Sequence, residues 1–109
     1  MIEVNCMTTE PTDTTLAPRD EVVIVTMHNI YRFTVENPED CSGTLDGGVL
    51  PERSRGVLCG ALDELSAFHP ATLRVGARAL FLVADEEDGS GFRKIITSPL
   101  VNLHIVAAG

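Results

Sequence analysis

Two runs of β-branched and aromatic residues lie close together in the first third of the chain. They cover residues 22–27 and 30–36, and only His28 and Asn29 separate them. Two such runs joined by two residues predict a β-hairpin. Histidine and asparagine are among the non-glycine residues that adopt the positive φ of such a turn, so this connection fits the prediction.

The register of this hairpin divides its side chains between two faces. Pairing Met27 with Ile30 places Ile24 opposite Phe33, because residues opposite each other in an antiparallel pair lie on the same side of the sheet. The face that we expect in the core carries Val22, Ile24, Thr26, Tyr31, Phe33 and Val35.

The rest of the chain alternates short apolar runs with turn residues. Strands are predicted at 44–50, 56–62, 71–75, 78–84, 92–97 and 100–106,. Leu62, Leu65 and Phe68 recur at every third position, which predicts a short helical turn after the second of these strands. The Gly47–Gly48 pair implies a bulge, a sharp bend or the close approach of another backbone.

Short strands at this spacing predict an all-β fold with at most one short helix. A small five- or six-stranded barrel or roll fits better than a two-sheet sandwich, which usually needs about seven strands in about 100 residues. The interruption at Ser98–Pro99 before a short closing strand resembles SH3-type barrels in outline, where a turn of 3₁₀ helix precedes the last strand. This likeness concerns shape and implies no binding residues.

The first twenty residues differ from the rest of the chain. They are rich in threonine, proline and acids and have no apolar periodicity, which predicts a disordered or loosely ordered tail over 1–20 and a single domain over 21–109. Met7 is an alternative start to Met1.

Composition and charge narrow the class of protein. With 109 residues, 44% of them hydrophobic and 22% charged, the chain suits one folded domain,. Sixteen carboxylates against eight basic residues give a net charge of −8, which disfavours sequence-independent nucleic-acid binding. No apolar run approaches the roughly 18 residues that cross a bilayer, and no basic, apolar leader precedes the strands. We therefore expect a cytoplasmic location and neither nucleic acid nor membrane as a partner.

Cysteines and histidines are the first candidates for chemistry. Three cysteines cannot all pair within one chain and lack the close spacing of a zinc ribbon, so reduced thiols are predicted. A thiol or metal site would have to combine members of the set Cys41, Cys59, His28, His69 and His104,. Because these positions are scattered along the chain, structural roles such as core packing or turn formation are favoured over a shared site. Cys41 and His69 are the two residues for which the sequence pattern indicates no such role.

The acidic run 85–88 is the second candidate. Asp85, Glu87 and Asp88 offer the hard oxygen ligands that calcium and magnesium prefer, but their spacing does not match an EF-hand loop,. A solvated hairpin tip is the simpler interpretation.

A further candidate is an anion pocket lined by Tyr31 and the arginines Arg32, Arg74 and Arg78. Ion pairing of these arginines with the surplus acids is favoured instead.

The absence of known catalytic motifs favours an interaction protein over an enzyme. The sequence contains no P-loop, dinucleotide fingerprint, nucleophile elbow or zincin pair,. The outer face of the hairpin is too apolar for a fully wet surface, so the final strand, the helical turn or a second subunit should cover it. Its residues are Val23, Val25, Met27, Ile30 and Arg32.

The sequence therefore predicts a small, acidic, non-catalytic module that binds a protein partner or itself, for instance as a homodimer, without a cofactor. The alternative is a small metal- or thiol-dependent protein that uses Cys41 or Cys59 with a histidine, or the acidic loop 85–88 with a divalent ion.

Overall fold

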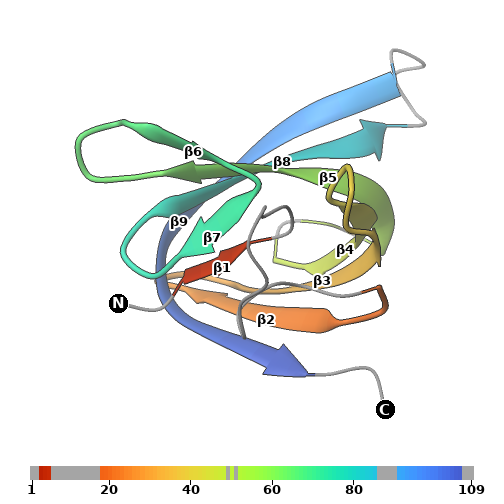
Figure 1. Ribbon diagram of the computed structural model, residues 1–109, viewed down its shortest axis with the longest axis horizontal. Helices are drawn as coiled ribbons and strands as arrows, with labels where there is room; N and C mark the ends of the chain where they lie inside the picture. The colour runs from red at the N-terminus through yellow and green to blue at the C-terminus, as the bar shows by residue number, and fades with distance from the viewer. Residues whose placement is uncertain (1–2, 6–17, 49, 51, 86–90, 107–109) are drawn as a thin grey trace.

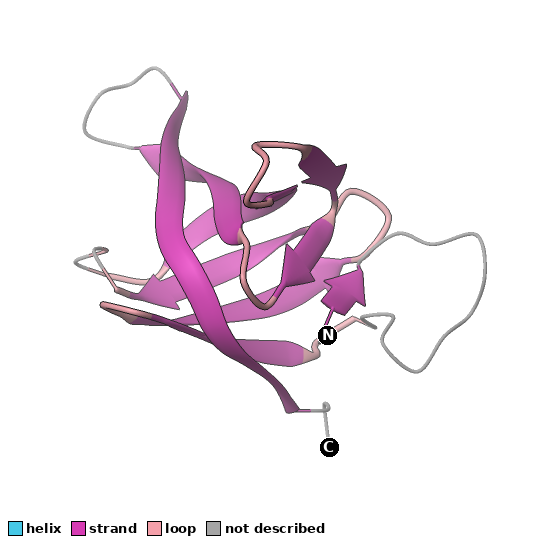
Figure 2. Cartoon of the chain, turned by 90° about the vertical axis from the view of Figure 1, so that its left-hand side faces the viewer, coloured by secondary structure: helices cyan, strands magenta, loops and turns pink. Residues whose placement is uncertain are grey.

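All regular structure in the described part of the chain is β-strand (Figures 1 and 2). The computed structural model describes residues 3–5, 18–48, 50, 52–85 and 91–106. Its strands are β1 (Glu3–Asn5), β2 (Glu21–Thr26), β3 (Ile30–Asn37), β4 (Ser42–Gly47), β5 (Ser54–Leu62), β6 (Phe68–Pro70), β7 (Thr72–Arg74), β8 (Arg78–Asp85) and β9 (Gly91–Val106). The all-β prediction is confirmed.

The main sheet is antiparallel and its hydrogen bonds form a ring. Seven strands follow the order β4-β3-β2-β9-β8-β5-β6, and an additional pairing joins β4 to β5. This pairing connects six of the strands in a ring, while β6 extends the sheet beyond β5. Figure 1 shows β2 and β3 in the lower part of the molecule and β5 and β8 in the upper part, with β9 passing from one to the other.

A single strand, β9, connects the two parts of the ring. Its first part pairs with β8 up to Pro99, and its second part pairs with β2 from Leu100 onward. The break predicted at Ser98–Pro99 is therefore wrong, and the interruption that resembled SH3-type barrels is absent. The Leu100 N–H donates to the carbonyl of Ala77 at 2.9 Å, so the backbone remains hydrogen-bonded where β9 changes partners.

The hairpin of β2 and β3 forms as predicted, but its register differs by two residues. Val25 lies opposite Ile30, and Thr26–Asn29 form the connection. The Thr26 hydroxyl accepts hydrogen bonds from the N–H groups of His28 (3.3 Å) and Asn29 (2.9 Å) and donates to the Asn29 carbonyl at 3.1 Å. This side chain stabilises a longer turn than the pattern predicts. A shift of two residues leaves every side chain on its predicted face.

The interior of the ring contains the predicted core face. Val22, Ile24, Tyr31, Phe33 and Val35 are at most 2% exposed. The rings of Phe33 on β3 and Phe81 on β8 lie 5.4 Å apart and tilted by 57°, a favourable arrangement for aromatic pairs. This contact joins the lower and upper parts of the ring through the core.

A separate two-stranded sheet lies beside the ring. β1 pairs with β7 and places Val4 opposite Leu73, and Leu73 is fully buried in the main core. Residues 3–5 of the predicted tail thus form a strand. The tail residues 6–17, with Cys6 and the alternative start Met7, lie outside the described residues.

The two adjacent glycines at the end of β4 have a geometric role. Gly47 has a φ of 93° and Gly48 a φ of 56°, and a Cβ on Gly47 would overlap the carbonyl oxygen of Ile30. Only glycine tolerates both conditions. The predicted close approach of another backbone is confirmed at Gly47.

Candidate functional site

A tight turn joins β5 to β6 where the sequence predicts a helical turn. One carboxylate oxygen of Asp63 accepts hydrogen bonds from the N–H groups of Leu65 and Ala67, both at 2.9 Å. Ser66 has a φ of 62°, which a helix does not permit. The helical prediction is wrong because the Asp63 side chain binds the backbone directly, as aspartate often does in turns.

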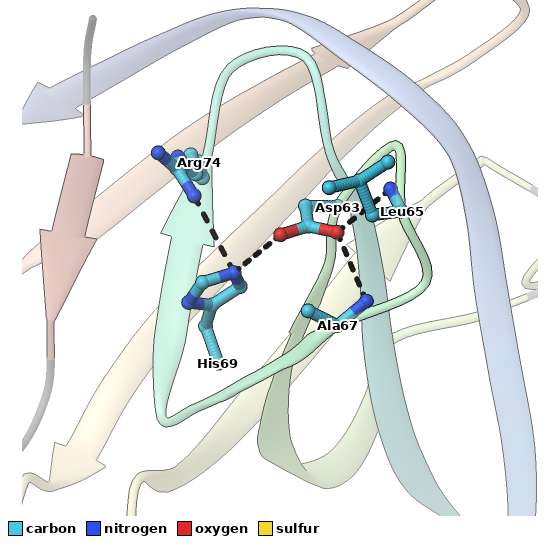
Figure 3. A network of polar contacts seen from close by, with 5 residues as sticks. All are labelled: Asp63, Leu65, Ala67, His69 and Arg74. Carbon is cyan, nitrogen blue, oxygen red and sulfur yellow. Dashed lines mark hydrogen bonds and ion pairs between the residues drawn. The ribbon is translucent and has the colours of Figure 1, made fainter.

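The second oxygen of Asp63 contacts His69. Its distance to His69 Nε2 is 2.9 Å, and the same nitrogen lies 3.4 Å from Nη1 of Arg74 on β7 (Figure 3). A carboxylate only accepts hydrogen bonds and a guanidinium only donates them, so one ring nitrogen cannot satisfy both partners. The shorter contact favours a proton on Nε2 that is donated to Asp63, with Arg74 adding its positive charge nearby.

These hydrogen bonds stabilise the charged form of Asp63. The bond from His69 contributes most, and the bonds from the Ala67 and Leu65 backbone add to it, so the pKa of the Asp63 carboxyl lies below its ordinary value although partial burial opposes the shift. The side chains of His69 and Asp63 are 35% and 23% exposed. Solvent therefore screens this pair partly.

A depression of about 220 Å³ adjoins this network. Asp63, Glu64, Leu65, Arg74, Val75, Gly76 and Ala77 line it, and His69 does not. Pockets for organic ligands usually measure about 300–1,000 Å³. Within the described residues, the His69 side chain contacts Asp63 and Arg74, and no contact with a cysteine or hydroxyl is found. The arrangement therefore acts as a connection between β5, β6 and β7.

The other predicted histidines lie elsewhere on the molecule. His28 lies in the hairpin turn, and its Nδ1 is 2.8 Å from the hydroxyl of Ser98 on β9. His104 is exposed on β9 opposite Val23. In the part of the chain that the structure describes, no three residues among His, Cys, Asp and Glu form a group that could hold a metal. Glu87 and Asp88 lie outside the described residues, as does the side chain of Asp85.

The cysteines differ in redox state. Cys59 is free and half-buried, and burial raises the pKa of its thiol, although a hydrogen bond with the Leu82 backbone and the charge of Lys94 oppose this. Cys41 is fully buried and disulfide-bonded, so the prediction of reduced thiols is wrong for Cys41. The only other cysteine in the sequence, Cys6, lies outside the described residues. Spacing alone could not reveal this bond.

The four residues considered for an anion pocket, for which the sequence favours ion pairing, do not lie around one cavity. Tyr31 is buried, Arg32 is exposed on the outer side of the same strand, and Arg78 Nη1 donates to the Thr97 carbonyl at 3.4 Å. Only Arg74 lines the depression near Asp63. Asp63 is not among the residues predicted from the sequence, because an aspartate beside a turn is too common to single it out.

Four of the residues predicted as an interface lie on the outer side of β2 and β3, and the fifth, Met27, lies in the connection between these strands. Val25 lies opposite Ile30, and Val23 lies opposite Arg32. Met27 and Ile30 are 66% and 57% exposed, whereas Val23 and Val25 are half-buried. We call Val23, Val25, Met27, Ile30 and Arg32 the hairpin face.

Comparison with protein-family models, curated proteins and solved structures finds no match for this chain. No helix in the described ranges is long and apolar enough to cross a membrane.

Proposed function

We propose that this chain is a non-catalytic module that associates with a second copy of itself through the hairpin face. The observation that carries the proposal is the exposure of Met27 and Ile30 beside the half-buried Val23 and Val25. Apolar side chains that gather on one exposed face are typical of contact surfaces.

The charges around the hairpin face favour a second copy over an unrelated protein. Arg32 lies opposite Asp46 on β4, and Glu21 lies on the same outer side of β2. A face with an apolar centre and charges of both signs is self-complementary, because a twofold axis brings the arginine of one copy towards an acid of the other. A symmetric dimer would cover Ile30 in both copies.

The test of this proposal is the oligomeric state of the wild-type protein and of Ile30→Glu. We expect a dimer whose dissociation constant rises at least about tenfold in the variant, since the substitution places two buried carboxylates in each interface. Sedimentation equilibrium over a range of concentrations measures both constants.

A matched control separates this effect from a general effect of charge. Leu65 is 89% exposed in the Asp63 turn, outside the hairpin face, so Leu65→Glu should leave the dissociation constant unchanged. A wild-type monomer at millimolar concentration, or equal weakening by both substitutions, would contradict the proposal. Equal melting temperatures would show that neither substitution unfolds the chain.

We also infer that the ring of six strands is a small closed barrel or roll. The pairing of β4 with β5, which joins the two ends of the strand order, supports this interpretation. Closure removes the free edges that an open sheet would present.

A further inference from the structure

A second outer surface of the sheet has a different chemical character from the hairpin face. On β5, β8 and β9 the residues that alternate with the core point outward, and cross-strand pairing places Leu82 between Val57 and Lys94 and places Leu80 opposite Ile96. Phe92, opposite Ala84, is 61% exposed, and Ile96 is 49% exposed. We call Val57, Leu80, Leu82, Phe92, Lys94 and Ile96 the β8 face.

The strands that form the β8 face contain almost no acids. Residues 54–62, 78–84 and 91–106 include no aspartate or glutamate, although the chain has sixteen acids, and they hold four of its eight lysines and arginines. Those four are Arg55, Arg78, Arg93 and Lys94. In sequence, Asp63 and Glu64 directly follow β5, and the acidic run 85–88 begins at the end of β8. Lys94 lies on the β8 face, and Arg55 and Arg78 lie on the same outer side of β5 and β8, whereas Arg93 lies opposite the buried Val83. The β8 face is therefore apolar with positive charge at Lys94 and at its borders, on a protein whose net charge is −8.

The backbone of these strands determines what kind of segment can bind. β8 is hydrogen-bonded to β5 on one side and to β9 on the other, so its backbone offers no edge for an added strand. A segment that packs on the face must satisfy its own backbone groups, as an α-helix does. Three strands about 4.8 Å apart make a face about 10 Å wide, which matches the diameter of a helix.

We propose that the β8 face binds an acidic amphipathic helix of a partner protein. Apolar side chains of the helix would pack on Leu80, Leu82, Phe92 and Ile96. Glutamates at the border of its apolar stripe would approach Lys94, Arg55 and Arg78. The outward residues of β8 from Leu80 to Ala84 extend over about 13 Å, the length of about nine helical residues. A second copy is disfavoured on this face, because two positive surfaces would meet.

The free thiol of Cys59 provides a reporter on this face. It lies beside the Leu82 backbone and within the influence of the Lys94 charge, so a helix packed on Leu82 would cover it. The rate at which iodoacetamide alkylates Cys59 under non-reducing conditions therefore measures occupancy of the β8 face.

The experiment uses three synthetic peptides of about 14 residues, a length that gives about four helical turns. The first has leucines in a helical stripe flanked by glutamates, the second has lysine in place of every glutamate, and the third is a scrambled form of the first. We expect the first peptide alone to bind the full chain, as measured by fluorescence anisotropy, and to slow alkylation of Cys59 at least fivefold. Its affinity should fall as salt is added.

Point variants of the protein show on which face the acidic peptide binds. Lys94→Glu should weaken binding of the acidic peptide about tenfold and improve binding of the lysine peptide, whereas Ile30→Glu on the hairpin face should change neither. Equal binding of all three peptides, no binding at millimolar concentration, or protection of Cys59 by higher protein concentration alone would overturn the proposal. Because self-association is measured separately, this proposal and the proposed function can fail independently.

Discussion

At the scale of single residues, the side chain of Asp63 makes three hydrogen bonds. It binds two backbone N–H groups with one oxygen and His69 with the other. Its carboxylate therefore holds the β5–β6 turn in one conformation and attaches β6 to it. The neutral form can accept fewer of these hydrogen bonds, so the turn depends on ionisation of this group.

Acidification should weaken the fold through Asp63. Since the pKa of Asp63 is lower in the folded chain than its ordinary value, its contribution to stability is present above about pH 4 and is lost as the pH falls through the folded-state value. Asp63→Asn keeps an acceptor for the backbone and removes the charge. We expect this variant to lose less stability than the wild type between pH 5 and pH 2, as measured by urea unfolding.

Glu64→Gln is the matched control for the acid experiment. Glu64 is the adjacent acid and is exposed, so its removal should leave the pH dependence of unfolding nearly unchanged. The same steep loss of stability in Asp63→Asn as in the wild type would show that other carboxyls cause acid unfolding.

Residue types predicted burial well and predicted polar contacts poorly. The alternation of apolar residues in the first hairpin identified Val22, Ile24 and Phe33 as core, because burial depends on a pattern that extends over many positions. The contacts of Asp63 and the disulfide of Cys41 depend on single side chains brought together by the fold. No local pattern in the sequence carries that information.

At the scale of secondary-structure elements, Gly60 allows β6 to pair with β5. A Cβ at this position would overlap the carbonyl oxygen of His69 and lie 2.9 Å from the Phe68 ring. Gly60→Ala should therefore separate the two strands and cost about 1–3 kcal/mol of unfolding free energy. Faster hydrogen exchange of the Ala61 amide, which pairs with His69, should accompany the loss,.

Gly76→Ala distinguishes this clash from backbone strain alone. Gly76 has a φ of 91°, and a Cβ there meets no atom within 4 Å. Its substitution should cost only the strain of the left-handed conformation, roughly 1 kcal/mol. If both substitutions lower the free energy of unfolding equally and hydrogen exchange in β5 stays slow, close packing at Gly60 is not important for stability.

Strand positions were easier to predict than their connections. The apolar runs located most strands, but the hairpin register was wrong by two residues because the Thr26 hydroxyl favours a longer turn. Ser98–Pro99 looked like a break because proline lacks an N–H, yet β9 continues and changes partners there. Turn chemistry and partner changes depend on tertiary contacts that a periodicity does not contain.

At the scale of the whole molecule, the Cys41 disulfide adds a covalent constraint to a small core. Reduction should lower the free energy of unfolding by about 2–4 kcal/mol, the usual contribution of such a bond. Urea unfolding with and without reductant measures the difference. In Cys41→Ser the reductant should have no effect, and equal stability of the reduced and oxidised wild type would contradict the expectation.

The long strand β9 also has a consequence for biosynthesis. On the ribosome, the β2–β3 hairpin and the β5–β8 pair are made first, and each has an edge that only β9 covers in the finished protein. Until residues 91–106 emerge, both edges can pair with the strands of neighbouring nascent chains. Crowded synthesis on polysomes is therefore the stage at which this protein is most exposed to aggregation, and a chaperone that holds either edge would raise the yield of folded molecules.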